Sequence, residues 1–185
     1  MFLVISICGC NEQKEDPNNQ NGEDNTFPTS IPLSAVSLNV SDLIDSDQVG
    51  KDHYTEPYTA NDLTGNNIAW NIKEGYFTTF ASNTSRFMQS IIRFESNETA
   101  QQNIELYKPF LLEKNTNFSE EQMEKIGEKS FLIKGERLIN DNLTSVFLLS
   151  FTLKNVLVSF QGFGFEKNQI INYAEIVEDN IKEHI

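Results

Sequence analysis

Cysteine is almost absent from this chain of 185 residues. Its two cysteines, Cys8 and Cys10, lie within the first ten residues, and the rest of the chain has none. A secreted domain held by disulfides spreads an even number of cysteines through its body, so this class is excluded. Histidine is nearly as rare, with only His53 and His184. We therefore expect neither a zinc site, which takes three or four Cys, His or carboxylate ligands, nor a Ser-His-Asp triad.

Positive charge is also scarce. Fourteen Lys and Arg stand against 27 Asp and Glu, which gives a formal net charge of −13 at pH 7. Nucleic-acid binding needs basic patches, so it is excluded as a function. An acidic surface is most simply a solubility feature, and it disfavours flat contact with an anionic membrane. No cofactor is expected either, since Gly162-Phe163-Gly164 lacks the third glycine and the βαβ setting of a phosphate-binding loop.

No apolar run in the sequence is long enough to span a membrane, which takes about 20 residues. The short run at the start of the chain ends in Ile7-Cys8-Gly9-Cys10. These four residues resemble a lipobox, in which an aliphatic residue and small residues precede a lipid-bearing cysteine. The resemblance implies cleavage after Gly9 and a lipid anchor on Cys10, at the extracytoplasmic face of the cell membrane. Because one acyl chain gives only marginal attachment, we expect two or more on Cys10.

The segment before the lipobox departs from a complete signal peptide. Such a signal has a basic n-region and an apolar stretch of roughly 7–15 residues. Here no Lys or Arg precedes Cys8, and only six residues separate it from Met1. We therefore expect a start upstream of Met1 or a degenerate signal. The alternative is the hydrophobic N-terminus of a cytosolic protein with two incidental thiols.

Three regions follow from composition. Residues 1–9 are interpreted as a signal peptide remnant. Residues 10–30 are acidic and Asn-rich with one large apolar side chain, Phe27, so they are predicted to form a disordered, lipid-anchored tether. Residues 31–185 are a normal length for a single domain with its own core.

Hydrophobic periodicity predicts the secondary structure of that domain. The expected strands are Ala35–Val40, Tyr76–Ala81, Phe87–Phe94, Ser130–Ile133, Val146–Leu153 and Val156–Phe163. The last two strands flank the turn Lys154-Asn155, with Asn155 expected at a left-handed position. The stretch Asp45–Gly65 is polar and reads as an irregular excursion.

Three helices are expected. Ser96 or Asn97 begins the first, whose inward face is Ala100, Ile104, Tyr107 and Leu111, and Pro109 is expected to kink it or end it early. A short second helix runs from Ser119 to Gly127. The last helix turns Ile170, Ala174, Val177 and Ile181 inward.

Tight hairpins and amphipathic helices together predict an α+β fold. We expect an antiparallel sheet of about five to six strands with two main helices packed on one face. Four pieces of sequence, Val40–Leu43, Phe94-Glu95-Ser96, Ile126–Phe131 and Phe151–Phe160, then resemble small prokaryotic lipoproteins, archaeal or bacterial, with a PsbP-like α+β sandwich domain. The resemblance implies an extracytoplasmic accessory or ligand-binding module, and it supplies no catalytic residues.

Candidate contact residues are aromatic. Phe160, Phe163 and Phe165 are interpreted in one of two ways. Either they form a strand end that presents rings to a ligand or partner, or Phe160 lies in the core and Phe163 or Phe165 packs under the last helix. No metal site is expected. The nearest candidate is an EF-hand-like spacing of Asp45, Asp47, Gly50 and Glu56, but Val49 stands where an oxygen ligand is needed and no helical pattern flanks the loop.

Asparagine supplies another set of candidate positions. Five Asn-x-Ser/Thr triplets offer glycosylation acceptors, at Asn39, Asn83, Asn97, Asn117 and Asn142. Roughly three such triplets arise by chance in a chain with this much Asn, Ser and Thr, so occupancy is an open hypothesis.

Three functions remain compatible with the sequence. The first is a lipid-anchored, non-catalytic module of the cell envelope that binds an unidentified protein or small molecule, with the membrane as its other partner through Cys10. The second is a surface hydrolase that uses a carboxylate pair. The third is a purely structural envelope lipoprotein. A concave pocket with two converging, poorly solvated carboxylates favours the hydrolase, whereas a flat aromatic patch favours the binder.

Overall fold

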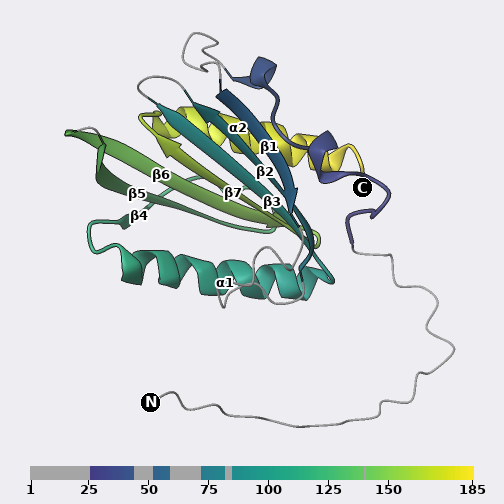
Figure 1. Ribbon diagram of the computed structural model, residues 1–185. Coiled ribbons are helices and arrows are strands. Elements are labelled where there is room, and N and C mark those ends of the chain that lie inside the picture. Colours follow the sequence, from purple (N-terminus) through teal and green to yellow (C-terminus); the bar gives the residue numbers. More distant parts are fainter. Residues whose placement is uncertain (1–25, 44–51, 59–71, 82–84, 140) are drawn as a thin grey trace, which may run out of the picture.

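The computed structural model describes residues 26–43, 52–58, 72–81, 85–139 and 141–185 (Figure 1). Seven strands of this described part form one antiparallel sheet in the order β1-β2-β3-β7-β6-β5-β4. The strands are β1 (Asp52–Tyr58), β2 (Ile72–Ala81), β3 (Arg86–Phe94), β4 (Ser119–Glu121), β5 (Lys129–Ile139), β6 (Asn142–Leu153) and β7 (Val156–Phe163). Two longer helices, α1 (Asn97–Lys114) and α2 (Lys167–Lys182), accompany the sheet. The predicted α+β class with an antiparallel sheet is confirmed.

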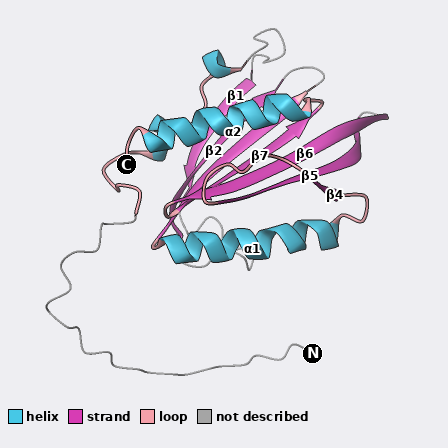
Figure 2. Ribbon diagram, turned by 180° about the vertical axis from the view of Figure 1, so that it is seen from behind, coloured by secondary structure: helices cyan, strands magenta, loops and turns pink. Residues whose placement is uncertain are grey.

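The two helices cover opposite faces of the sheet, which corrects the expectation that both pack on one face (Figures 1 and 2). On β6, Leu149 and Phe151 join the core cluster of α2, while Val146 and Leu148 join the cluster of α1. Neighbouring residues of a strand point to opposite faces, so a strand that is apolar at consecutive positions needs a cover on both sides. β6 is such a strand, and it is buried along its whole second half.

The core under α2 is aromatic and closely packed. Phe87 of β3 stacks on Phe160 with 5.5 Å between ring centroids, and it meets Tyr173 of α2 edge-on at 5.1 Å. The predicted inward residues of α2 are all fully buried: Ile170, Ala174, Val177 and Ile181. The face of α1 is confirmed as well, with Ala100 and Ile104 buried and Tyr107 and Leu111 packed against the second cluster.

Three local predictions are wrong. The expected strand Ala35–Val40 is replaced by two 3₁₀ turns, Leu33–Ala35 and Val40–Asp42, of which the second is closed by a capping box between Asn39 and Asp42. The expected helix at Ser119 is the short edge strand β4, since its polar side chains pack against no apolar face. Strand β1 lies inside the stretch that was predicted to be irregular.

Of the two effects expected, the kink stays a prediction, and the early end of the helix is wrong at Pro109. Helix α1 continues five residues beyond it, to Lys114. The cost of an interior proline is offset because Tyr107 and Leu111, on either side of it, pack against the core.

The turn between β6 and β7 differs from its prediction in one detail. Lys154, not Asn155, takes the left-handed conformation, with φ of 53°. The Asn155 side chain instead points into the fold and is 1% exposed, so its polar atoms lie in the protein interior.

Phe27 also belongs to the folded part. The sequence placed it in the tether, yet its side chain is fully buried in the core beside Val36 and Leu38. Its backbone N–H donates to Asn155 Oδ1 at 2.6 Å. The boundary at residue 30 stays a prediction. Phe27, which lies on the tether side of that boundary, is attached to the fold by this hydrogen bond.

Candidate functional site

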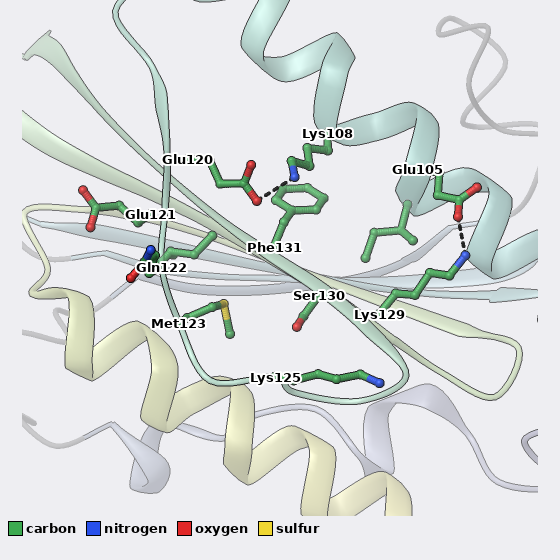
Figure 3. A pocket seen from close by; sticks show the side chains of 12 residues that line it. Glu105, Lys108, Glu120, Glu121, Gln122, Met123, Lys125, Lys129, Ser130 and Phe131 are labelled. Atoms are coloured by element: carbon green, nitrogen blue, oxygen red, sulfur yellow. Dashed lines mark hydrogen bonds and ion pairs between the residues drawn. The ribbon is translucent and has the colours of Figure 1, made fainter.

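A groove of about 840 Å³ lies between α1 and the start of β5 (Figure 3). Its volume is within the usual range for small-molecule sites, roughly 300–1,000 Å³. Three parts of the chain form its walls. They are Ile104, Glu105 and Lys108 on α1; Glu120, Glu121, Gln122, Met123 and Lys125 on β4 and the segment after it; and Lys129, Ser130, Phe131 and Leu132 on β5.

The α1 wall is positioned by a helix cap. Ser96 Oγ accepts a hydrogen bond from the backbone N–H of Thr99 at 3.2 Å, which satisfies an N–H that a helix start leaves without a partner. Beyond the cap, Ala100 and Ile104 are buried against the sheet. Because residues three and four apart share a helix face, Lys108 follows Ile104 along the groove.

The opposite wall is positioned by Gly127. It takes a left-handed φ of 63°, and a Cβ at this position would lie only 2.3 Å from the carbonyl oxygen of Thr152. Its N–H donates to Glu178 Oε1 of α2 at 2.8 Å, and the N–H of Glu128 donates to Thr152 O at 2.7 Å. Only glycine fits this close approach, which lets the chain turn from the groove wall into β5.

Each carboxylate of the groove faces a lysine. Glu120 pairs with Lys108 across 2.6 Å, and Glu105 pairs with Lys129 (Figure 3). Glu121 lies 3.5 Å from Lys167, the first residue of α2. The three carboxylate side chains are 35–61% exposed, so each pair is solvated and contributes at most about 1 kcal/mol to stability.

Lys125 is the exception among the lysines that line the groove. Within the described ranges its ammonium makes no ion pair and no hydrogen bond, and it lies across the groove from Glu105 and Lys108 (Figure 3). The floor between these walls is apolar, with Ile104 and Phe131 at the base. The groove therefore combines an apolar base with a polar rim that carries one cation without a partner.

This arrangement does not fit carboxylate catalysis. A glycosidase needs one carboxylic acid whose burial keeps it protonated. The groove carboxylates are 35–61% exposed and each faces a lysine, so none of them is a buried carboxylic acid of that kind. Among the described residues, no group of three His, Cys, Asp or Glu could hold a metal ion.

A second, smaller cavity of about 150 Å³ lies on the sheet face that α1 covers. Ser150 and Ser159 line it and share a hydrogen bond of 2.8 Å. Tyr107 of α1 closes one side, and its burial raises the pKa of its hydroxyl above the usual value. The cavity has room for a few waters or a small polar group.

The aromatic residues that the sequence singled out do not form a contact surface. Phe160 is 2% exposed and Phe165 is 6% exposed, and both rings pack with Phe87. Phe163 is partly buried against the α1 core. These positions agree with the alternative interpretation, in which Phe160 lies in the core and Phe165 packs under the last helix, where its ring meets Tyr173.

Several other predicted positions lie outside the described residues. These include Cys10, the sequon at Asn83, and the first three positions of the calcium-like loop. Four sequons can be placed. Asn39, Asn117 and Asn142 are exposed and Asn97 is half-buried, so glycosylation stays a prediction there. Asn117 also donates to the carbonyl of Glu136 at 2.6 Å, a contact that a glycan would have to replace.

The groove itself was not expected from the sequence. Its ion pairs join residues that lie 12, 24 and 46 positions apart. The one available signal was the concentration of acidic and basic residues between Ser119 and Lys129, a segment that was instead interpreted as a helix.

Comparison with known proteins identifies a fold but no family. No family model matches the chain, and no curated protein matches its sequence. Among solved structures, the chain is similar to the extracellular domain of PknH from Mycobacterium tuberculosis, with a TM-score of 0.60 and 12% identity. The match covers 82% of this chain and 95% of that one. The α+β fold thus occurs in a prokaryotic extracellular domain; the likeness to PsbP-like proteins stays a resemblance of sequence.

Proposed function

We propose that this chain is a lipid-anchored extracytoplasmic module that binds a ligand or partner without catalysis. The observation that carries the proposal is the groove beside α1, whose carboxylates are all solvated and paired with lysines. Such a rim can recognise a ligand by charge and hydrogen bonds.

Two further observations support the location. The lipobox-like Ile7-Cys8-Gly9-Cys10 precedes a polar, acidic stretch. The similar solved structure is an extracellular domain, so this fold is compatible with work outside the cell. Among the described helices, none is long and apolar enough to cross a membrane.

The anchor is tested by phase partitioning of the full chain expressed in a prokaryotic host with lipoprotein processing. We expect the wild-type chain in the detergent phase and Cys10→Ala in the aqueous phase, because the substitution removes the acylated thiol. Cys8→Ala is the matched control: it changes the neighbouring thiol to a residue that lipoboxes accept and should leave partitioning unchanged. Mass spectrometry of the N-terminus should find an acylated Cys10. An unacylated chain that begins at Met1 would refute the proposal.

A further inference from the structure

The residues that line the groove include three glutamates and three lysines, but not all of them pair with one another. Glu105 and Glu120 pair with two of these lysines, and Glu121 pairs with Lys167, which lies outside the lining. Lys125 is therefore the lining lysine that forms no ion pair with any of the described side chains. The nearest acid along the chain, Glu124, is exposed but does not line the groove. The protein as a whole has a net charge of −13. An ammonium without an ion-pair partner at the rim of an open groove nevertheless attracts a negatively charged ligand group to that place.

The same groove offers an apolar contact next to that charge. Met123 is partly buried on the wall, and Phe131 lies in the base. The lysine pairs that surround them are solvent-exposed and weak, so the long lysine stems can move aside at little cost. A ligand that enters can therefore bury a short apolar body against Met123 and Phe131 while its charged end stays at the rim.

We propose that the groove binds a small organic anion, in which one acidic group is joined to a short apolar body, and that Lys125 holds the acidic group. This inference rests on the proposed function and names the ligand class of its site. Charge complementarity selects the sign of the ligand. The apolar base selects an amphiphile over a free inorganic ion.

The test uses the full chain carrying Cys10→Ala and four probes: octanoate, octanol, octyltrimethylammonium and inorganic phosphate. Binding is measured by titration while backbone amide signals are followed by NMR. Octanoate should shift the amides of residues 122–131. Octanol and phosphate, which each lack one half of the proposed ligand, should bind at least about tenfold more weakly, and the cationic probe should not bind at the groove.

Variants locate the acidic group. Lys125→Gln should weaken octanoate binding by roughly fivefold, the usual worth of an exposed charge contact. Two matched controls should not weaken it: Lys114→Gln, an exposed lysine on α1 outside the groove, and Glu124→Gln, the acid beside Lys125.

Four results would overturn the ligand class. They are equal binding of octanol, equal binding of phosphate, an unchanged affinity in Lys125→Gln, and no binding of any probe. A fifth is a response centred on Leu138 and Leu143, which are 69% and 66% exposed at the β5–β6 hairpin and would report unspecific apolar adsorption. None of these five binding results affects the phase partitioning of Cys10→Ala. A wrong ligand class can therefore be distinguished from a wrong lipid anchor.

Discussion

Two hydrogen bonds join Asn155 and Phe94 at the end of the sheet. The Asn155 side-chain Nδ2 donates to the carbonyl oxygen of Phe94 at 2.6 Å, and the Phe94 N–H donates to the carbonyl oxygen of Asn155 at 2.8 Å. Since Asn155 Oδ1 also accepts from the N–H of Phe27, one amide joins the N-terminal segment, β3 and the β6–β7 turn.

Asn155→Ala should therefore destabilise the fold by about 2–4 kcal/mol, because it leaves the buried N–H of Phe27 and carbonyl of Phe94 without this partner. The free energy of unfolding in urea measures the effect. Asn168→Ala, at an exposed position in the first turn of α2, is the control and should stay within about 0.5 kcal/mol of wild type. Equal stability of the two variants would show that water replaces the Asn155 amide.

Gly127 carries the second prediction. Alanine there must adopt a left-handed φ, which costs about 1–2 kcal/mol, and must also push its Cβ away from the carbonyl of Thr152. Gly127→Ala should lower the free energy of unfolding by at least about 2 kcal/mol. Gly164→Ala is the matched control, since Gly164 has φ of 72° but is exposed, and it should show the conformational cost alone. Identical losses would contradict the close approach to Thr152.

Local patterns predicted much of the fold. Strand β7 has its predicted bounds, Val156–Phe163, because an alternating run stands between a two-residue turn and a glycine. Helix α1 begins after Ser96, one of the two predicted caps. In these elements the deciding interactions lie within a few residues, where sequence periodicity and capping rules apply.

Contacts between distant segments were not predictable in the same way. Strand β4 consists of Ser119, Glu120 and Glu121, and it pairs with β5. Its own polar side chains do not indicate a strand, because the pairing depends on the neighbouring strand β5. Burial on both faces of β6 was not predicted, because polar residues such as Ser150 and Thr152 are typical of a solvated face; in the structure they are 1% and 0% exposed. The groove is a result of the same kind of long-range arrangement.

Glu98 gives a prediction about pH. It lies in the first turn of α1, where a hydrogen bond from its own backbone N–H and another from Ser96 lower the pKa of its carboxyl below the usual value for glutamate. A depressed folded-state pKa contributes stability above the unfolded value, and that contribution is lost as the pH falls through the folded value. Glu98→Gln should therefore lower stability at neutral pH and converge with wild type under acid conditions.

Urea midpoints of wild type and Glu98→Gln, measured from neutral pH down to about pH 3, test this convergence. Glu113→Gln, an exposed acid at the other end of α1, is the matched control and should not show it. If the difference between wild type and Glu98→Gln were the same at every pH, the helix N-terminus would not be the source of the shift.

The last prediction concerns Arg93, which is 2% exposed and contacts the same N-terminal segment as Asn155. Its guanidinium donates to the carbonyl oxygen of Ile31 at 2.5 Å, pairs with Glu74, and lies 5.2 Å from the ring centroid of Phe27. Burial lowers the pKa of Arg93, and the contact with Glu74 opposes that shift, so the cation faces the ring in a poorly solvated place. A cation–π contact is strongest under such conditions.

A double-mutant cycle isolates this contact. Arg93→Met keeps the length of the side chain and Phe27→Leu keeps an apolar group, so each removes one half of the pair. We expect a coupling free energy of about 1 kcal/mol between the two substitutions. The same cycle at Arg137 and Phe118, 5.7 Å apart with an exposed arginine, should give a smaller value. A coupling near zero for Arg93 and Phe27 would mean that Arg93 fixes the segment through the Ile31 carbonyl and Glu74 alone, and that Phe27 contributes only its buried apolar area.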